Sequence, residues 1–379
     1  MNELLPRLIA ADEIARAARP HEMNRAIADL RCGDFVLLRD GDRATLIQAA
    51  ETADDGSLAR AVAITGCAPV MAVTRRRAAA LGLCTEERGS EAVELVLAEA
   101  GPASRLNQLA DPTLVLALPP DSVTPREAPA DGTAAAAIEL ARLARLLPAT
   151  VMFAMSARAA ELVRQAGIVE LGIATVFEHG SVLARTLRRV VDARVPLADA
   201  EEARIVAFRP DDGGTDHLAI LIGEPDPTQP VLTRVHSECF TGDLLASLRC
   251  ECGEQLRGAI RVIAESGGGV LVYLAQEGRG IGLVNKLRAY RLQDAGFDTV
   301  DANEQLGFAA DERVYQPAAE MLRDLGFTRV RLLTNNPDKV AALARHGIEV
   351  IERVPHAFAA NAHNRDYLRT KAVRSGHLF

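Results

Sequence analysis

Apolar residues recur with the spacing of helices and strands in short segments along the first half of the chain. His21 to Leu30 has a helical pattern, and residues 34–40 and 44–51 have the pattern of two strands separated by a turn. Another apolar run, at 68–74, leads into a helix rich in arginine and alanine. Residues 119–133 combine proline, aspartate and glycine, which is typical of a loop. This half is therefore predicted to be mixed α/β.

The second half has the pattern of strands connected by helices. Residues 267–276 form a buried strand pattern, followed by the glycine-rich segment 277–283. Helical spacing then links five apolar residues and stops at Gly326: Val314, Ala318, Met321, Leu322 and Leu325. A strand over 330–334, a helix from Pro337 to about Gly347 and a strand over 348–354 complete a βαβ-like pattern.

The length of the chain points to two domains. At 379 residues it exceeds the size at which one hydrophobic core usually stops growing. The halves also differ in composition, because all four tyrosines and the only three lysines among 43 basic residues (Lys286, Lys339, Lys371) lie beyond residue 200. We predict a mixed α/β protein with one domain over 1–190 and another, a mixed sheet with flanking helices, over 191–379.

Charge and hydropathy exclude several function classes. The formal net charge of −8 shows no basic excess for nucleic acid. The longest uncharged apolar runs, such as Thr113 to Pro120, are far shorter than the roughly 20 residues that span a bilayer. Residues 1–19 interrupt their apolar positions with charge, unlike a signal peptide. We expect a cytoplasmic protein, not a membrane protein, whose six cysteines are free for metal or catalytic duty.

Three cysteines are spaced like metal ligands. Cys239, Cys250 and Cys252 form C-x10-C-x-C, and in a reducing compartment such thiolates most simply bind zinc. Cys250 and Cys252 point the same way if that segment is extended. Without an obvious fourth thiolate, the open position is typical of catalytic zinc, whose bound water has a pKa of roughly 7. The alternative is a structural zinc closed by His236 or an acidic residue.

The glycine-rich segment 277–283 is not a dinucleotide fingerprint. That motif, if it began at Gly278, would need glycine where Leu283 stands. The glycines allow close approach to a phosphate or a base, and Glu277 and Arg279 suit a guanine edge and an anion. A plain tight turn with a surface ion pair explains the same residues.

Two further positions have both a functional and an ordinary interpretation. Asp311 and Arg313 are predicted to open a helix, either as an N-cap and a solvated charge or as functional groups. Lys339, at a helix start after a strand, is either a phosphate ligand or a solvated lysine.

Four ordered motifs together resemble GTP cyclohydrolase II of riboflavin biosynthesis, over roughly residues 190–379. They are RVHSECFTGDLLASLRCECGEQL (234–256), QEGRGIGLVNKLRAYRLQDAGFDTVDANEQLGFAADER (276–313), RLLTNNPDK (331–339) and YLRTKAVRSGH (367–377). The resemblance implies a dimeric enzyme that converts GTP to formate, pyrophosphate and 2,5-diamino-6-(5-phosphoribosylamino)pyrimidin-4(3H)-one. It also implies one Zn²⁺ per subunit, supplying the water that attacks C8 of guanine, and Mg²⁺ on the polyphosphate.

The resemblance also assigns roles to individual residues. Cys239, Cys250 and Cys252 match the zinc ligands, Asp311 the proton acceptor, Arg313 the nucleophile at the α-phosphate, and Tyr290 the tyrosine that favours complete hydrolysis over a formylated intermediate. The positions that match GTP-binding residues are Arg234, Val235, His236, Ser237, Glu238, Gln255, Glu277, Gly278, Arg279, Thr299, Thr334 and Lys339. Zinc with three thiolates is less electron-poor than zinc with three imidazoles, so its water needs a carboxylate base. Deprotonating a guanidinium at pH 7 costs about 8 kcal/mol, which favours charge stabilisation over a covalent role for Arg313.

The first half more weakly resembles 3,4-dihydroxy-2-butanone 4-phosphate synthase. Where that family has an acidic DRENEGD-type stretch, Asp42 and Arg43 run directly into ATLIQAAE, and the later GHTEA-type segment is also missing. We predict a degenerate domain kept for stability or dimer contact. The alternatives are a bifunctional enzyme that also makes the butanone phosphate from ribulose 5-phosphate, or a GTP-binding regulatory protein whose zinc is structural.

Overall fold

The computed structural model describes residues 21–86, 89–98, 101–115, 122–358 and 374, so the signal-peptide question at 1–19 and nearly all of the motif at 367–377 lie outside it. Contacts divide the chain into two units. The first unit comprises residues 1–179, 287–297 and 301–310, and the second comprises 180–286, 298–300 and 311–379. The boundary therefore lies inside the helix α7 (Ile173–Arg185).

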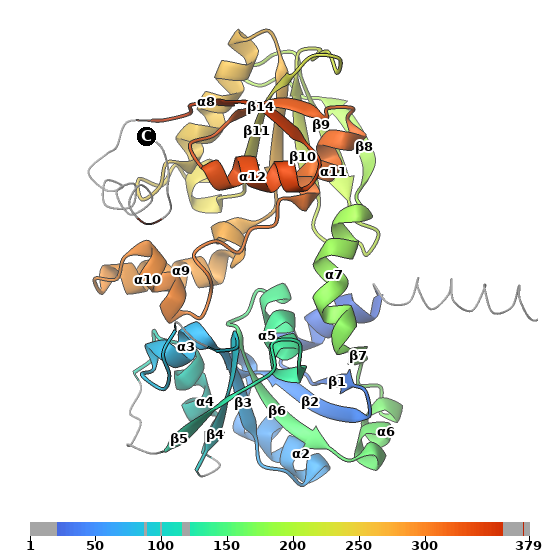
Figure 1. The fold of residues 1–379 in the computed structure, drawn as a ribbon, viewed down its shortest axis with the longest axis vertical. Coiled ribbons are helices and arrows are strands. Elements are labelled where there is room, and N and C mark those ends of the chain that lie inside the picture. Colours follow the sequence, from blue (N-terminus) through green and yellow to red (C-terminus); the bar gives the residue numbers. More distant parts are fainter. Residues whose placement is uncertain (1–20, 87–88, 99–100, 116–121, 359–373, 375–379) are drawn as a thin grey trace, which may run out of the picture. The chain divides into compact units, whose positions relative to one another are not determined.

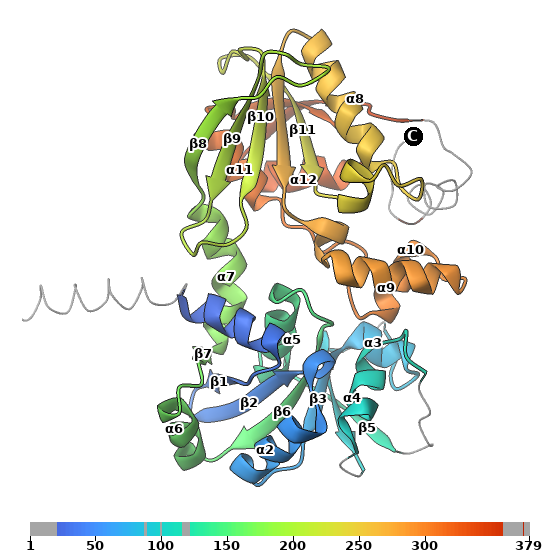
Figure 2. The ribbon, with the colours of Figure 1, turned by 180° about the vertical axis from the view of Figure 1, so that it is seen from behind.

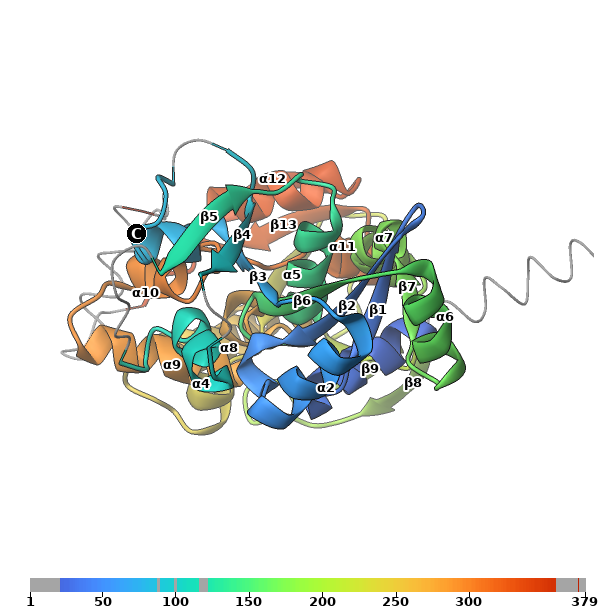
Figure 3. The same cartoon turned by 90° about the horizontal axis from the view of Figure 1, so that it is seen from below.

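The first unit is built on a seven-stranded sheet, seen from below in Figure 3. Its strands are β1 (Val36–Asp40), β2 (Arg43–Ala49), β3 (Val70–Thr74), β4 (Ala92–Leu97), β5 (Val123–Glu127), β6 (Ala149–Met155) and β7 (Glu170–Gly172). In the order β5-β4-β3-β6-β2-β1-β7 the neighbours are antiparallel, except that β1 and β7 are parallel. The strands predicted from 34–40, 44–51 and 68–74 are thus confirmed.

One prediction for this half was wrong. The segment 119–133 was expected to be a loop, but it contains β5. β5 is an edge strand with mostly exposed residues. Pro125, which has no N–H to donate, is therefore tolerated there, because no inner strand loses a hydrogen bond.

Helices cover both faces of the first sheet. They are residues 21–32, α2 (Asp55–Thr65), α3 (Arg75–Ala80), α4 (Ala103–Ala110), α5 (Thr133–Leu143), α6 (Ala157–Gln165) and α7, with the short helix η1 (Ala50–Thr52). Side chains alternate across a strand, so Val36 and Leu38 join the core with α5 and the first helix, whereas Leu37 packs with α6.

Two helices from the second half of the sequence belong largely to the first unit. They are α9 (Leu283–Asp294) and α10 (Thr299–Gln305). The Arg288 guanidinium pairs with Glu51 at 2.8 Å and with Asp111 at 3.0 Å. The Arg77 side chain, almost fully buried, donates to the Gln305 carbonyl at 3.1 Å. The domain boundary predicted at 190/191 does not include these two helices in the first domain.

The second unit contains another seven-stranded sheet (Figure 1). Its strands are β8 (Arg188–Arg194), β9 (Ala203–Arg209), β10 (His217–Ile222), β11 (Val231–Ser237), β12 (Gly269–Leu274), β13 (Arg329–Leu333) and β14 (Glu349–Val354). In the order β14-β13-β11-β12-β10-β9-β8, the first four are mutually parallel and the remaining pairs are antiparallel. The predicted mixed α/β fold with a mixed sheet is therefore confirmed.

Helices pack on opposite faces of this sheet (Figure 2). The helix α8 (Cys252–Glu265) contributes Ala259 and Ile263 to one core, and α11 (Gln316–Asp324) and α12 (Pro337–Arg345) contribute to the other. The expectation that Asp311 caps a helix was wrong, because α11 begins only at Gln316. No helix in the described ranges is long and apolar enough to cross a membrane.

Candidate active site

The chemistry-bearing residues of the second unit gather where its parallel strands end. β11, β12, β13 and β14 run in one direction, so their carboxyl ends share one edge of the sheet. The loops that follow these ends carry the first thiol, the glycine-rich segment, the TNN sequence and His356. Ligands of α/β sheets bind at such an edge, because loops from neighbouring strands converge there.

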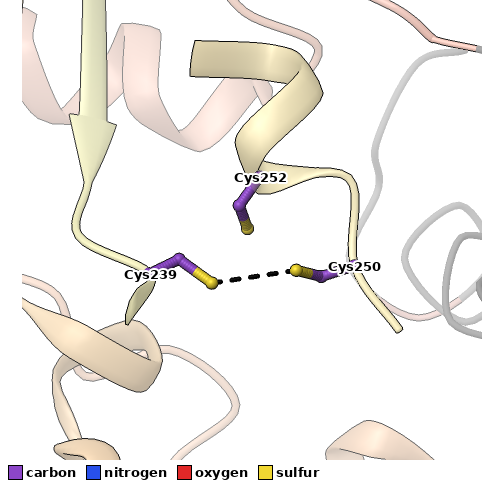
Figure 4. Close-up of side chains that lie close together, drawn as sticks. All are labelled: Cys239, Cys250 and Cys252. Atoms are coloured by element: carbon purple, nitrogen blue, oxygen red, sulfur yellow. Dashed lines mark hydrogen bonds between the residues drawn. The ribbon is translucent and has the colours of Figure 1, made fainter. Parts of the chain in front are cut away.

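The three predicted metal ligands meet at this edge (Figure 4). Cys239 follows β11, Cys250 lies in the next loop, and Cys252 is the first residue of α8. Their sulfur atoms all lie within 4.8 Å of one another, and those of Cys239 and Cys250 are 3.7 Å apart. The segment between Cys250 and Cys252 is not extended, since Glu251 has φ −98° and ψ 3° before the helix starts.

Gly242 leaves the space that the thiols need. It lies in the π-helical turn η2 (Phe240–Leu244) after Cys239. A Cβ atom at this position would lie 2.7 Å from the Cys250 sulfur and 3.0 Å from the Cys239 sulfur. Only glycine therefore fits beside the three thiols.

Proton sharing within the cluster is uneven. Hydrogen bonds from the Cys250 and Cys252 thiols, together with the ammonium of Lys286, lower the pKa of Cys239. The same hydrogen bonds, in which these two thiols serve as donors to Cys239, raise the pKa of Cys250 and raise that of Cys252 well above its usual value. Three sulfur atoms that share protons in this way can together bind a thiophilic cation, which replaces the protons that remain on the thiols. The residues present thus fit zinc.

The interpretation that His236 closes the metal site is not favoured by its hydrogen bonding. The Nε2 atom of His236 lies 3.1 Å from both Asp243 carboxylate oxygens, and the ring stacks on Tyr273. Burial lowers the pKa of His236, so the ring is neutral and Nε2–H donates to Asp243. In the described residues, the group of potential ligands contains the three cysteines alone.

Asp243 organises the loop that carries the first thiol. Its carboxylate accepts from His236, from the Tyr273 hydroxyl at 2.9 Å and from the Cys239 amide at 3.0 Å. Three donors on one buried carboxylate fix the start of the loop relative to β11 and β12.

A buried ion pair lies on the other side of Cys239. The Lys286 ammonium donates to the Cys239 sulfur at 3.0 Å, to the Thr241 hydroxyl at 2.9 Å and to the Glu277 carboxylate at 2.9 Å. The other Glu277 oxygen accepts from the Phe240 amide at 2.5 Å. Glu277, predicted as a GTP ligand, thus has both oxygens engaged within the protein.

The glycine-rich segment forms the short helix η3 (Glu277–Gly280) with left-handed residues inside it. Gly278 has φ 64°, and Arg279 adopts φ 61° although it carries a side chain. The Arg279 carbonyl accepts from the Glu312 amide at 3.0 Å, which joins this turn to the segment of Asp311. The tight turn is real, and its strained Arg279 is unusual for a residue with a Cβ atom.

Arg234 is buried beneath the edge. Its guanidinium donates to the Leu333 carbonyl at 2.9 Å and to the Gln255 side chain at 2.7 Å. Burial lowers the pKa of Arg234 to about 10, so it stays charged near neutrality. The backbone carbonyl of Gln255 in turn accepts from His356 Nε2 at 2.9 Å.

Lys339 and Thr334 lie at the start of α12. The Lys339 ammonium is buried and donates to the Val235 carbonyl at 3.0 Å, so the solvated-lysine interpretation was wrong. The buried Thr334 hydroxyl accepts from the Asn336 amide at 3.0 Å. Both residues lie at the carboxyl end of β13, beside that of β11.

Asp311 and Arg313 pair with each other instead of opening a helix. The Arg313 Nε atom donates to Asp311 at 2.7 Å, and a second guanidinium nitrogen contacts the other oxygen. Although burial opposes it, this pairing lowers the pKa of Asp311. The Arg313 guanidinium and the Lys339 ammonium lie 5.7 and 5.8 Å from the centre of the Tyr315 ring. Burial raises the pKa of Tyr315 to about 12.

Several buried polar atoms at this edge have no hydrogen-bond partner among the described residues. They are Arg234 Nε, His236 Nδ1, Ser237 Oγ, Gln276 Oε1 and Tyr315 Oη. Buried polar groups in native proteins are nearly always paired, so such a concentration is typical of a site that a polar ligand fills. Three of these atoms belong to β11, the strand that leads into Cys239.

The remaining predicted residues are placed as follows. Val235 is buried in β11, and Glu238, half-buried, donates its amide to the Leu274 carbonyl. Tyr290 lies on the part of α9 that belongs to the first unit, and Thr299 begins α10. The roles of these four residues stay predictions.

Sequence reasoning missed Asp243, Tyr273, Lys286 and Tyr315. Asp243 is the only acidic residue between Cys239 and Cys250, and Lys286 is one of three lysines, so both had a signal. For Tyr273 and Tyr315 the only signal was that all tyrosines of the chain lie in its second half.

The comparisons with known proteins agree with this geometry, which is that of an α/β enzyme with a thiolate site able to hold a metal ion. Residues 188–355 match the GTP cyclohydrolase II family. The chain is 54% identical to the GTP cyclohydrolase-2 of Azospirillum brasilense, over 98% of this chain and 96% of that one. The chain therefore belongs to the GTP cyclohydrolase II family, hydrolases of riboflavin biosynthesis.

Two further similarities are to a riboflavin biosynthesis protein and to a solved two-domain structure. The riboflavin biosynthesis protein RibBA of Chlorobium phaeovibrioides is 45% identical over 65% of this chain, and the match covers 62% of that protein. The crystal structure of RibBX, a two domain 3,4-dihydroxy-2-butanone 4-phosphate synthase from A. baumannii, matches over 89% of this chain and 99% of that one, at 19% identity. Its TM-score of 0.35 is too low to support an argument about the first unit.

Proposed function

We propose that the chain hydrolyses GTP to formate, pyrophosphate and 2,5-diamino-6-(5-phosphoribosylamino)pyrimidin-4(3H)-one, with zinc held by Cys239, Cys250 and Cys252. The observation that carries this proposal is the group of unpaired buried polar atoms in the second unit, three of which belong to β11, the strand that leads into Cys239 and the thiol cluster. A polar, multiply charged substrate supplies partners for those atoms, and family membership makes GTP the substrate to test.

When held by the three cysteines, zinc would supply Lewis-acid activation of water. Residues of the chain then orient the substrate and handle protons. Asp311 is the proton acceptor, and its lowered pKa keeps it ionised at neutral pH. It must exchange its bond with Arg313 for one with the reacting water, a rearrangement that binding of an anion to Arg313 favours.

The polyphosphate is assigned to the cations around Tyr315. The Arg313 guanidinium and the Lys339 ammonium lie 5.7 and 5.8 Å from the centre of its ring, and the Tyr315 hydroxyl is buried without a hydrogen-bond partner among the described residues. Two cations and a hydroxyl suit phosphate oxygens, and Mg²⁺ accompanying the substrate neutralises the rest of its charge. Stabilisation of phosphate charge by Arg313 needs no deprotonation, which favours it over the nucleophilic role. A cytoplasmic homodimer completes the proposal.

The first unit is assigned as a degenerate 3,4-dihydroxy-2-butanone 4-phosphate synthase domain. Two of its carboxylates, Glu51 and Asp111, are paired with Arg288 and so do not form an open acidic site for Mg²⁺. Incubation of purified protein with ribulose 5-phosphate and Mg²⁺ tests this assignment. Formation of formate and the butanone phosphate would establish the bifunctional alternative instead.

The cyclohydrolase is tested by product analysis. Wild-type protein loaded with zinc is incubated with GTP and Mg²⁺, and the products are separated by chromatography. Cys252→Ser is expected to lose zinc and turnover together, whereas Cys84→Ser, a thiol of the first unit, retains both. Zinc-loaded wild type that binds GTP but leaves it unchanged would favour the regulatory protein, and a formylated product would contradict the role of Tyr290.

A further inference from the structure

Lys286 makes a direct contact with one of the three thiols, and it lies outside the roles assigned so far. Its Nζ atom lies 3.0 Å from the Cys239 sulfur, and the residue is 9% exposed. An ammonium has three N–H donors. Here the acceptors are the Cys239 sulfur, the Thr241 hydroxyl and the Glu277 carboxylate, so the orientation of the ammonium is fixed by three contacts.

The surroundings show why a cation at this position matters. Three thiolates around a divalent ion carry one excess negative charge, in a place where Cys239 and Cys250 are buried. An ammonium bonded to a thiolate sulfur draws electron density from that ligand and offsets the excess charge. Glu277 holds the ammonium in place while its second oxygen binds the Phe240 amide, next to Cys239 in the chain.

We propose that Lys286 is a positioning residue for the metal, an inference that rests on the proposed zinc site. It holds the Cys239 sulfur in its ligating orientation and reduces electron donation from that sulfur to the ion. The residue type supports this assignment, because all but three of the 43 basic residues of the chain are arginine. A compact ammonium reaches a sulfur, a hydroxyl and a carboxylate from one atom, whereas a planar guanidinium spreads its donors.

The first test measures the thiolate–metal bond itself. Wild type and Lys286→Met are loaded with Co²⁺, and the sulfur-to-cobalt charge-transfer absorption is recorded. Removing the donor makes the Cys239 sulfur easier to oxidise, so the band is expected to shift to lower energy. Arg291→Met is the control, because it removes an exposed cation from the same helix, α9.

The second test measures zinc retention against a competing chelator. Loss of a partner that orients a ligand typically lowers metal affinity about 10- to 100-fold, and this loss is expected for Lys286→Met. The single variant leaves the buried Glu277 carboxylate without its cation, which alone destabilises the fold. The double variant Lys286→Met/Glu277→Gln removes both charges, and the same red shift and loss of affinity are expected from it.

The outcomes separate this inference from the proposed function. Wild type that binds neither Zn²⁺ nor Co²⁺ would overturn both. Wild type that binds both ions, with charge-transfer bands and zinc affinities unchanged in the double variant, would overturn only the role of Lys286. A shift and a loss in both Lys286 variants, absent from Arg291→Met, would support it independently of GTP turnover.

Discussion

The two units share a seven-stranded sheet but differ in the direction of the strands. In the second unit four neighbouring strands are parallel, so four loops meet at one edge, and that edge holds the thiols and the unpaired polar atoms. In the first unit only β1 and β7, among the described strands, form a parallel pair. Glu51 and Asp111 there end in ion pairs instead. Strand polarity thus explains why the loops of the second unit converge on one edge of its sheet.

The largest effect is expected at Gly242, which packs against the thiols of the second unit. A Cβ atom in Gly242→Ala must displace two thiols, so we expect a loss of about 100-fold in zinc affinity and in turnover. Zinc content and product formation measure it. Gly180→Ala is the control, because a Cβ there meets nothing within 4 Å and its φ is ordinary. Normal zinc content in Gly242→Ala would contradict the geometry described for the thiols.

The second prediction concerns pH. Burial lowers the pKa of His356 to about 4, from an ordinary value of about 6.5. Between these values the unfolded chain binds a proton that the folded chain does not, so stability is full above pH 6.5 and falls toward pH 4, by as much as about 3 kcal/mol. Urea unfolding across this range should show a flatter profile for His356→Gln than for wild type. His346→Gln should retain the wild-type profile.

The third prediction tests the ion pairs of the first unit. Arg288→Ala leaves two partly buried carboxylates without their cation, which is expected to cost about 1–3 kcal/mol of unfolding free energy. Arg291→Ala, at an exposed position of the same helix, is expected to change it by less than about 0.5 kcal/mol. Equal stability of the two variants would show that the pairing with Glu51 and Asp111 is not structural.

The smallest effect sharpens the assignment of the phosphate site. Tyr315→Phe removes a hydroxyl without a partner among the described residues, so the thermal midpoint should not fall. If that hydroxyl binds substrate, KM for GTP rises about 5-fold, the value of one hydrogen bond. Tyr273→Phe should do the opposite, because it loses the bond to Asp243 and with it stability. An unchanged KM in Tyr315→Phe would remove this tyrosine from the site.

Much of the fold was predictable because local patterns decide it. The strands β1, β2, β3, β12 and β13 and the helix α12 follow from the periodicity of apolar residues and from Gly and Pro signals. β5 was not predictable from the same rules, since its proline and exposed residues are those of a loop and only pairing with β4 makes it a strand.

The site shows the same division between local and long-range information. The spacing of Cys239, Cys250 and Cys252 was sufficient to predict their convergence. Lys286 and Asp243 depend on how α9 and β12 pack around the first thiol, which no local pattern contains. Asp311 was expected to cap a helix, but its bond to Arg313 replaces that cap.

The chain path described above has a consequence for dissecting the protein. The chain passes between units at 179/180 and again at 286/287, 297/298, 300/301 and 310/311. A shortened gene that starts at codon 191 would still encode Leu306 and Phe308, which are 1% and 2% exposed in the intact protein, but not Thr74 and Pro148, which lie close to Gly307 between them. In such a fragment these apolar side chains would lose residues that pack near them. Insolubility of the fragment would therefore reflect exposed apolar surface and would say nothing about its activity.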